Sequence, residues 1–324
     1  MFRFHLMLGC LLASSTSALA TVVWKGDFET GDRSQYSRAQ MVSPDRLQVV
    51  PSPRRQGKYA LRVEVRKGDD PIGASGYRNE LVKFDNSREG TEYYYAWSTL
   101  WPKDYPMAAA WQVVMQWHHP GCCGAPPIRL VLGCSVQDCG VALPDTLFFI
   151  VDGKTVWKKA GLRLGEWQDF ILHVKWSADR TRGFVELWHN DVLVLPKRMT
   201  RTMFSSSDVN YLKIGLYRDR SIQKTGVLFH DAVTQATTLA EARAALTEVP
   251  VVSAPAPTSP TDGGTVATSL PAPLSAEESP APTPEASPEE LLDARGGCQS
   301  APLSMLAPAA LLWVLVRRRA RGRL

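Results

Sequence analysis

The chain has 324 residues, of which 44% are hydrophobic and 21% charged, and its formal net charge is +5. These values are typical of a globular protein and exclude a chain that is disordered throughout. No nucleic-acid partner is expected, because no basic run of the kind that binds nucleic acid occurs outside the C-terminal tail, and a mildly basic globular segment suits a polyanionic ligand instead.

The first 20 residues have the features of a secretory signal peptide. Arg3 supplies the positive charge, residues 6–12 form an apolar stretch, and Ala18-Leu19-Ala20 matches an A-x-A cleavage site. Lipid modification of Cys10 is the alternative. We therefore expect an exported protein whose folded domain spans residues 21–250, and we expect that domain to be a monomer.

The C-terminal end is predicted to be a linker and a targeting segment rather than a folded domain. Residues 251–296 are rich in Pro, Ala, Ser, Thr and Glu, which is typical of a flexible stalk. Residues 297–324 hold Cys298, a short apolar run and a basic end. This tail resembles the myxobacterial C-terminal sorting signal, which implies surface anchoring and membrane contact through the tail alone. A simple membrane anchor is the alternative.

Four cysteines cluster inside the expected domain. In an exported protein an even, local set predicts two disulfides, and the pairing is left open except that adjacent cysteines are the least favoured pair. The neighbouring His118 and His119 fit no standard zinc spacing, so no metal site and no cofactor are predicted, although sandwich folds can hold a structural calcium ion. The disulfide candidates are Cys122, Cys123, Cys134 and Cys139.

Short segments of strand character fill the chain between residues 21 and 238. Asp152-Gly153 and Asn190-Asp191 are typical hairpin turns, and one helix is expected at 239–246. This pattern predicts an all-β fold, a jelly roll or two-sheet antiparallel sandwich with a concave substrate cleft. The expected strands, in chain order, are 59–65, 77–81, 91–101, 111–118, 128–133, 146–151, 154–159, 167–177, 183–190, 211–218 and 226–233.

Alternation along a strand sorts side chains onto two faces. In "YLKIGLYR" three aliphatic residues mark the core face, so Lys213 and Tyr217 must lie on the other. In "WQVVMQWH" strict alternation places Trp111 and Val113 with Trp117, opposite Gln116. If three such strands are neighbours, they present one polar face made of Arg78, Glu80, Gln116, His118, Tyr211, Lys213 and Tyr217.

These residue types can bind a carboxylate and move protons. Arg and Lys supply charge, Gln supplies amide donors, and His and Tyr can act as acid or base. An ordinary solvated sheet face is the alternative, and Arg78 with Glu80 also fits a structural ion pair. His119 is expected in a loop, and surface or packed positions are expected for His173, His189 and His230.

The segments "RNEL", "QWH" and "YLKIGLYR" resemble the three signature strands of jelly-roll polysaccharide lyases. This group includes heparin-lyase-I-like, glucuronan-lyase and alginate-lyase families, and the flanking text is most similar to the first two. Alginate lyases usually continue the last motif with Asn-Gln, whereas Arg218-Asp219 follow here. The resemblance therefore implies an anionic substrate of the glucuronan or glycosaminoglycan type.

The resemblance also implies a mechanism, β-elimination at a uronic acid. Gln116 and Arg78 would neutralise the carboxylate, Tyr217 would be the acid and in one version also the base, and His118 would be the base or a polarising group. Lys213 would assist Tyr217. Substrate contacts are expected from Glu80, Tyr211 and Arg218. A non-catalytic carbohydrate-binding module is the alternative. A hydrolase would need two cleft carboxylates, and only Glu80 is expected there.

Overall fold

The computed structural model describes residues 21–73, 75–121 and 124–247. The predicted signal peptide, stalk and C-terminal tail lie outside these residues, as do Cys122 and Cys123. Within the described part of the chain, no helix has both the length and the apolar character needed to cross a bilayer.

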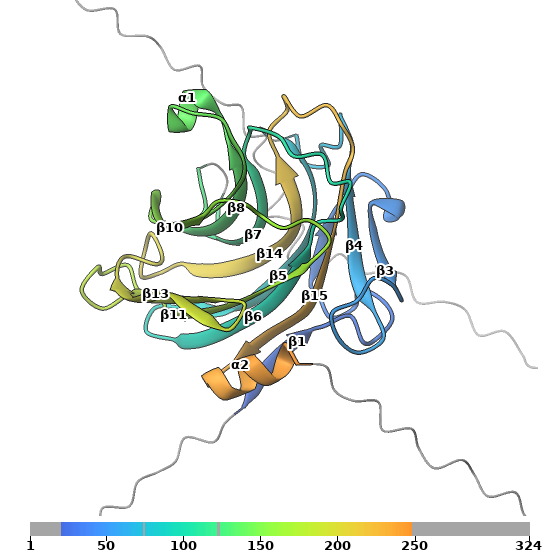
Figure 1. The fold of residues 1–324 in the computed structure, drawn as a ribbon. Coiled ribbons are helices and arrows are strands. Elements are labelled where there is room, and N and C mark those ends of the chain that lie inside the picture. Colours follow the sequence, from blue (N-terminus) through green and yellow to red (C-terminus); the bar gives the residue numbers. More distant parts are fainter. Residues whose placement is uncertain (1–20, 74, 122–123, 248–324) are drawn as a thin grey trace, which may run out of the picture.

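Two antiparallel sheets pack face to face (Figure 1). The outer sheet has eight strands among the described residues, and β1 (Val22–Gly26) pairs with the last residues of β15 at its side. The other outer strands lie in the order β13 (Val192–Met199), β12 (Phe184–His189), β11 (Trp167–Lys175), β6 (Glu92–Leu100), β15 (Gly226–Ala236), β4 (Ala60–Val65) and β3 (Leu47–Val50).

The inner sheet has seven strands among the described residues, and Figure 1 shows it as a curved sheet that lies against the outer one. Two short helices lie in connections, η1 (Pro44–Arg46) between β2 and β3 and α1 (Val136–Cys139) between β8 and β9, and a third, α2 (Leu239–Ala245), follows β15. The inner strands lie in the order β10 (Lys154–Lys159), β9 (Leu143–Val151), β8 (Ile128–Cys134), β7 (Gln112–His118), β14 (Val209–Arg218), β5 (Tyr77–Arg88) and β2 (Arg38–Gln40).

The predicted all-β sandwich is confirmed, together with both hairpins and the final helix. The hairpin turns join β9 to β10 and β12 to β13, and α2 packs on the outer sheet beside β15 and β6. The core between the sheets holds large aromatic side chains that are fully buried, and burying each of them removes about 150–250 Å² from water. They include Trp97, Trp101, Trp117 and Trp176.

One disulfide lies in the described part of the chain. Cys134, the last residue of β8, is bonded to Cys139 at the end of α1. This confirms a local disulfide in the predicted cysteine cluster. The bond closes a short loop that leads from β8 into β9.

The strict alternation predicted for β7 is wrong at its beginning. Val114 and the next residue, Met115, both pack in the main core, and the pairing with β8 shifts between Val113 and Met115. This β-bulge inserts one residue and reverses the faces of everything before it. Trp111 and Val113 therefore lie on the same side of the sheet as Gln116, packed in a small cluster with Tyr217.

His230 on β15 links the two sheets through the core. Its Nε2 donates to the carbonyl oxygen of Gly215 on β14 (2.9 Å), and its Nδ1 accepts from the Thr99 hydroxyl (3.0 Å). Complete burial lowers the pKa of His230 to about 4, against an ordinary value of 6.5. The imidazole is therefore neutral in the folded protein at neutral pH.

Acid is expected to destabilise the fold through His230. Between pH 6.5 and 4 the unfolded chain binds a proton that the folded chain refuses, so stability falls as pH falls, by up to about 1.4 kcal/mol per pH unit. Gln can replace both hydrogen bonds without titrating. Urea unfolding at pH 7, 6 and 5 should give a shallower pH slope for His230→Gln than for the wild type. Equal slopes would rule out this origin.

Gly215 is required by the close approach of β14 to β5. A Cβ atom there would lie 2.3 Å from the carbonyl oxygen of Asn79 and 2.8 Å from the Cα of Glu80. Gly215→Ala should lower the free energy of unfolding by about 1–3 kcal/mol, as overpacking does. Gly153→Asn is the control, because a Cβ at Gly153 meets nothing within 4 Å and Asn tolerates its positive φ. Chemical denaturation of both variants measures the difference.

Candidate active site

The three strands that carry the predicted polar residues are neighbours in the inner sheet, in the order β7, β14, β5. Lys213 on β14 lies opposite Gln116 on β7, and Gly215 lies opposite Glu80 on β5. Arg78 on β5 lies opposite Tyr217. Arg78, Glu80, Gln116, Lys213 and Tyr217 therefore share the side of the inner sheet that faces away from the core.

Glu80 is the centre of this cluster and is 2% exposed. Its carboxylate accepts a short hydrogen bond from the Gln116 amide and a longer one (3.4 Å) from Arg78 Nη1. Lys213 Nζ lies 4.0 Å from the same carboxylate and donates to Gln40 Oε1 on β2 (2.8 Å). Buried cations need such a counter-charge. The geometry makes Glu80 a group that positions the donors, as in the ion-pair alternative, rather than one that faces a substrate.

Tyr217 is held on three sides. The Arg78 guanidinium lies 3.5 Å from the centroid of its ring, Trp111 packs edge-on at 4.7 Å, and Ser75 Oγ is 2.5 Å from its hydroxyl. Gly76 permits this arrangement, because a Cβ there would lie 2.6 Å from the Tyr217 ring. The Tyr217 ring is thus fixed against the Arg78 guanidinium, and its hydroxyl lies within hydrogen-bonding distance of Ser75. Strict alternation predicted the core face for Trp111, because it does not account for the β-bulge in β7.

His118 lies at the other end of the cluster. It is opposite Tyr211 and stacks on that ring at 5.5 Å, while its Nδ1 is 2.7 Å from the His119 carbonyl oxygen. Burial, with Lys213 acting in the same direction, lowers the pKa of His118 to about 4. His118 is therefore neutral at neutral pH. Its partner Tyr211 is six residue steps from Tyr217 along β14, about 20 Å of extended strand.

Arg129 on β8 is a further cation of the site, and it is not among the site residues predicted from the sequence. It lies opposite Gln116, and burial lowers the pKa of its guanidinium while the nearby Tyr217 acts in the opposite direction. A lone arginine in the apolar segment "IRLVLG" was the available signal. By the strand register, the cations that share this side of the sheet with Glu80 include Arg38, Arg78, Arg129, Lys158 and Lys213.

The prediction that Arg218 contacts a substrate is wrong. Arg218 is the last residue of β14 and is 0% exposed, on the core side with Leu216. Its Nη1 donates to the Lys224 carbonyl oxygen (2.6 Å), and burial lowers its pKa. The alternation that places Tyr217 outward continues for one more residue, so Arg218 points inward and supports the end of the strand.

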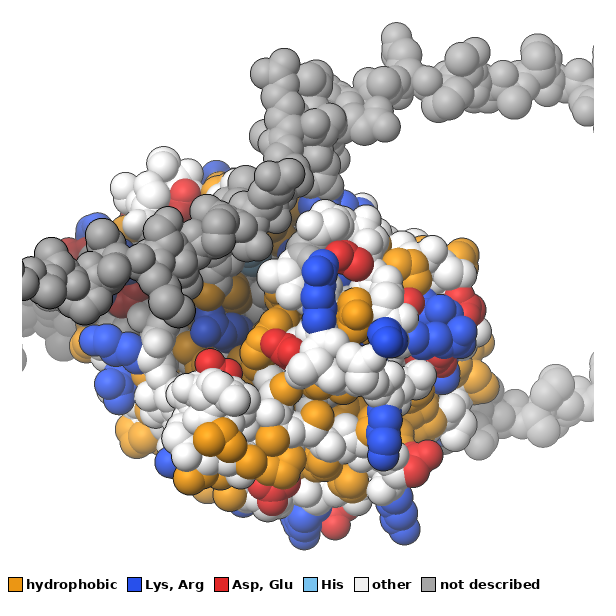
Figure 2. All heavy atoms as spheres, turned by 90° about the horizontal axis from the view of Figure 1, so that it is seen from above, with side chains coloured by type: hydrophobic (Ala, Val, Ile, Leu, Met, Phe, Trp, Pro, Cys, Tyr) orange, Lys and Arg blue, Asp and Glu red, His pale blue; other side chains and the backbone are white. Residues whose placement is uncertain are grey.

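The molecular surface is hollowed in the view of Figure 2, and basic side chains lie in the hollow beside a histidine. Among the described residues, no group of three or more His, Cys, Asp or Glu side chains is placed to hold a metal ion. The arrangement offers what acid–base chemistry on an anionic polymer needs, namely cations, amide donors and a phenol with its hydroxyl near the surface. Fold and site together define a jelly-roll protein with a polar, cationic face.

The polysaccharide lyase family model matches residues 28–234, and the chain belongs to this family. The protein is thus a polysaccharide lyase. No curated protein sequence matches the chain. The family match agrees with the predicted enzyme class, so the binding-module and hydrolase alternatives are set aside.

Solved structures share the fold at low sequence identity. An endo-β-1,4-glucuronan lyase from the fungus Trichoderma reesei is 17% identical, with a TM-score of 0.55 over 68% of this chain and 98% of that one. A GH131 β-glucanase catalytic domain from Podospora anserina is 16% identical, with a TM-score of 0.54 over 67% of this chain and 96% of that one. One fold thus serves a lyase and a glucanase, so the fold alone does not identify the reaction.

Proposed function

We propose that this lyase cleaves a uronic-acid-containing polysaccharide of the glucuronan or glycosaminoglycan type by β-elimination, with Tyr217 moving both protons. The observation that carries the proposal is the placement of Tyr217, whose ring lies on the Arg78 guanidinium beside the Glu80 cluster. The lysine and arginine side chains on this side of the sheet give it the charge that attracts a polyanion. The similar glucuronan lyase supports this substrate class.

Elimination begins with removal of the proton on C5, next to the carboxylate. The C4–oxygen bond then breaks, and the leaving oxygen takes up a proton. Negative charge grows on the carboxylate group during the first step, so donors must be aimed at it in advance. Arg78 and Lys213 supply positive charge for it through space, since both lie beside Glu80 just beneath this side of the sheet. Gln116, held by Glu80, adds the dipole of its amide.

Tyr217 alone suffices where the C5 proton and the C4 oxygen are on the same side of the sugar, as in glucuronate and mannuronate. Its phenolate takes the C5 proton, and the phenol then gives a proton to the leaving oxygen. Iduronate and guluronate place the two groups on opposite sides and need a second residue. His118 is neutral and can accept a proton, but it lies opposite Tyr211 at the other end of the cluster from Tyr217, so we assign it, together with Tyr211, contact with a neighbouring sugar of the same chain.

The test is incubation of the full chain with glucuronan, alginate, heparin and heparan sulfate. New ultraviolet absorbance from an unsaturated uronate is expected with at least one of them, and its absence from the whole panel would contradict the proposal.

The enzyme is proposed to act at the cell surface. Residues 1–20 support export through a signal peptide, and residues 297–324 support anchoring at the cell surface. Membrane contact through this tail alone and a monomeric domain are proposed with it. A polymer too large to enter a cell is best degraded there. Cell fractionation of the full-length protein and of a chain lacking residues 297–324 should show surface retention for the first and release for the second.

A further inference from the structure

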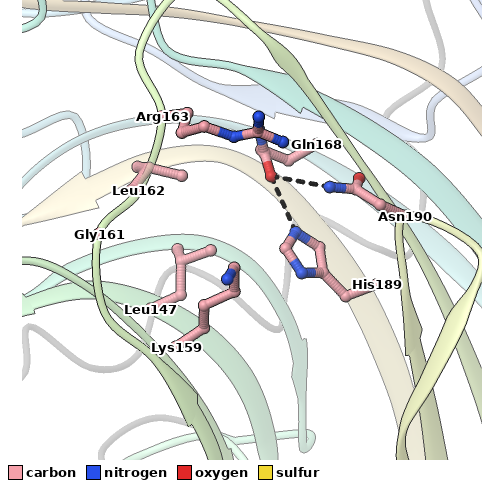
Figure 3. Close-up of a pocket in the computed structure, with 8 residues that line it drawn as sticks. All are labelled: Leu147, Lys159, Gly161, Leu162, Arg163, Gln168, His189 and Asn190. Carbon is pink, nitrogen blue, oxygen red and sulfur yellow. Dashed lines mark hydrogen bonds between the residues drawn. The ribbon is translucent and has the colours of Figure 1, made fainter.

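A pocket separate from the polar side of the inner sheet lies at the edge of the sandwich. There β9 and β10 of the inner sheet meet β11 and β12 of the outer sheet (Figure 3). Its volume is about 160 Å³, so it is a small site. The floor is formed by side chains that are more than nine-tenths buried, namely Leu147, Leu162, Gln168 and His189, and the exposed rim includes Lys159, Arg163 and Asn190.

His189 presents a hydrogen-bond acceptor to this pocket. Gln168 Oε1 lies 2.9 Å from His189 Nε2 and also accepts from Asn190 Nδ2 (3.2 Å). A carbonyl oxygen only accepts, so Nε2 carries the proton and Nδ1 is the acceptor. Nδ1 has no hydrogen-bond partner within the described chain and faces the side of Lys159 (Figure 3). The ring is fixed between Trp157 (5.5 Å) and Phe170 (4.8 Å).

The imidazole stays neutral under ordinary conditions, because burial lowers the pKa of His189 to about 4. The positive charge is instead at the rim, where Figure 3 shows Lys159 and Arg163 on opposite sides of the opening. Arg163 is paired with Glu166 at 3.1 Å, and both side chains are at least half exposed. Such a surface pair is weak and can be exchanged for a ligand carboxylate.

We propose that this pocket binds one acidic pyranose residue as a non-catalytic site. The ring would lie on Leu162, a hydroxyl would donate to His189 Nδ1, and the carboxylate would lie between Lys159 and Arg163. Apolar walls with a few convergent polar groups are typical of such sites. The inference extends the proposed function, since it takes the same class of acidic sugar.

An adjoining hollow shows how a longer chain would continue. It shares Arg163 and Asn190 with the pocket and adds Trp167, Arg54, Arg55 and two carboxylates, Asp191 and Asp169, the second of which is paired with Arg55 at 2.9 Å. Trp167 offers a half-buried ring beside Arg54 and Arg163. A second sugar would rest on this ring, so the site would take an end or a short stretch of the polysaccharide and keep the enzyme on its substrate.

The experiment is a titration of the full chain, labelled with ¹⁵N-histidine, with glucuronic acid. This probe has no glycosidic bond, so the result does not depend on elimination. A saturable shift of the His189 Nδ1 resonance is expected, assigned by its loss in His189→Gln. The double variant Lys159→Ala/Arg163→Ala should bind at least about tenfold more weakly by the same signal. Arg78→Ala, at the active site, should leave this binding unchanged.

Three outcomes would overturn the site. They are no saturable shift at His189, equal binding of uncharged glucose, and an equal shift with sulfate alone, which would mean anion binding without sugar recognition. A His189 shift in a protein that is inactive on every polyuronate would overturn the proposed reaction and leave this site standing.

Discussion

Tyr217→Phe should lower the rate of elimination by about 10²- to 10⁴-fold while the fold remains intact. Phe keeps the ring against the Arg78 guanidinium and the edge of Trp111, so packing is preserved. Only the hydroxyl is lost, together with its contact to Ser75. Initial rates of ultraviolet absorbance increase on the best substrate measure the effect, and thermal unfolding checks the fold.

Tyr77→Phe is the matched control for this change. Tyr77 lies next to Arg78 on β5, but it packs against the core from the opposite side of the strand. The same loss of a hydroxyl there should leave the rate within about twofold of wild type, because surface and packing changes of this size are small. If Tyr217→Phe retained activity at the level of this control, Tyr217 would not transfer the protons.

Glu80→Ala should lower the free energy of unfolding by about 3–5 kcal/mol, the usual cost of removing one partner of a buried ion pair. Arg78 and Lys213 are 5% and 3% exposed, so water cannot replace the missing carboxylate. Gln116 loses its acceptor as well. Activity should fall with stability, because the donors for the uronate carboxylate lose the group that aims them. Urea unfolding and lyase assays measure both.

Glu166→Ala provides the comparison at the surface. Its ion pair with Arg163 is exposed on both sides, and removing it should cost less than about 1 kcal/mol. If Glu80→Ala were as stable as this control and only the KM for polysaccharide rose, Glu80 would contact the substrate and would not be the positioning group inferred from its three partners.

The sequence by itself determined the faces of β5 and β14. Three aliphatic residues of "YLKIGLYR" must be buried, so period-two alternation leaves Lys213 and Tyr217 on the outer side. The same rule places Arg78 with Glu80, and the hairpin turns and final helix follow from local chemistry. These features depend only on neighbours along the chain, which is why a single sequence suffices for them.

Tertiary structure decided what depends on contacts between distant residues. The bulge in β7 arises from its pairing with β8 and β14, and it alone brings Trp111 beside Tyr217. The cluster around Glu80 exists because β7, β14, β5 and β2 are neighbours in the sheet, an order that alternation cannot predict. The pocket at His189 joins four strands of two sheets. Strand order and register are set by packing of the whole core, so local pattern gives no access to them.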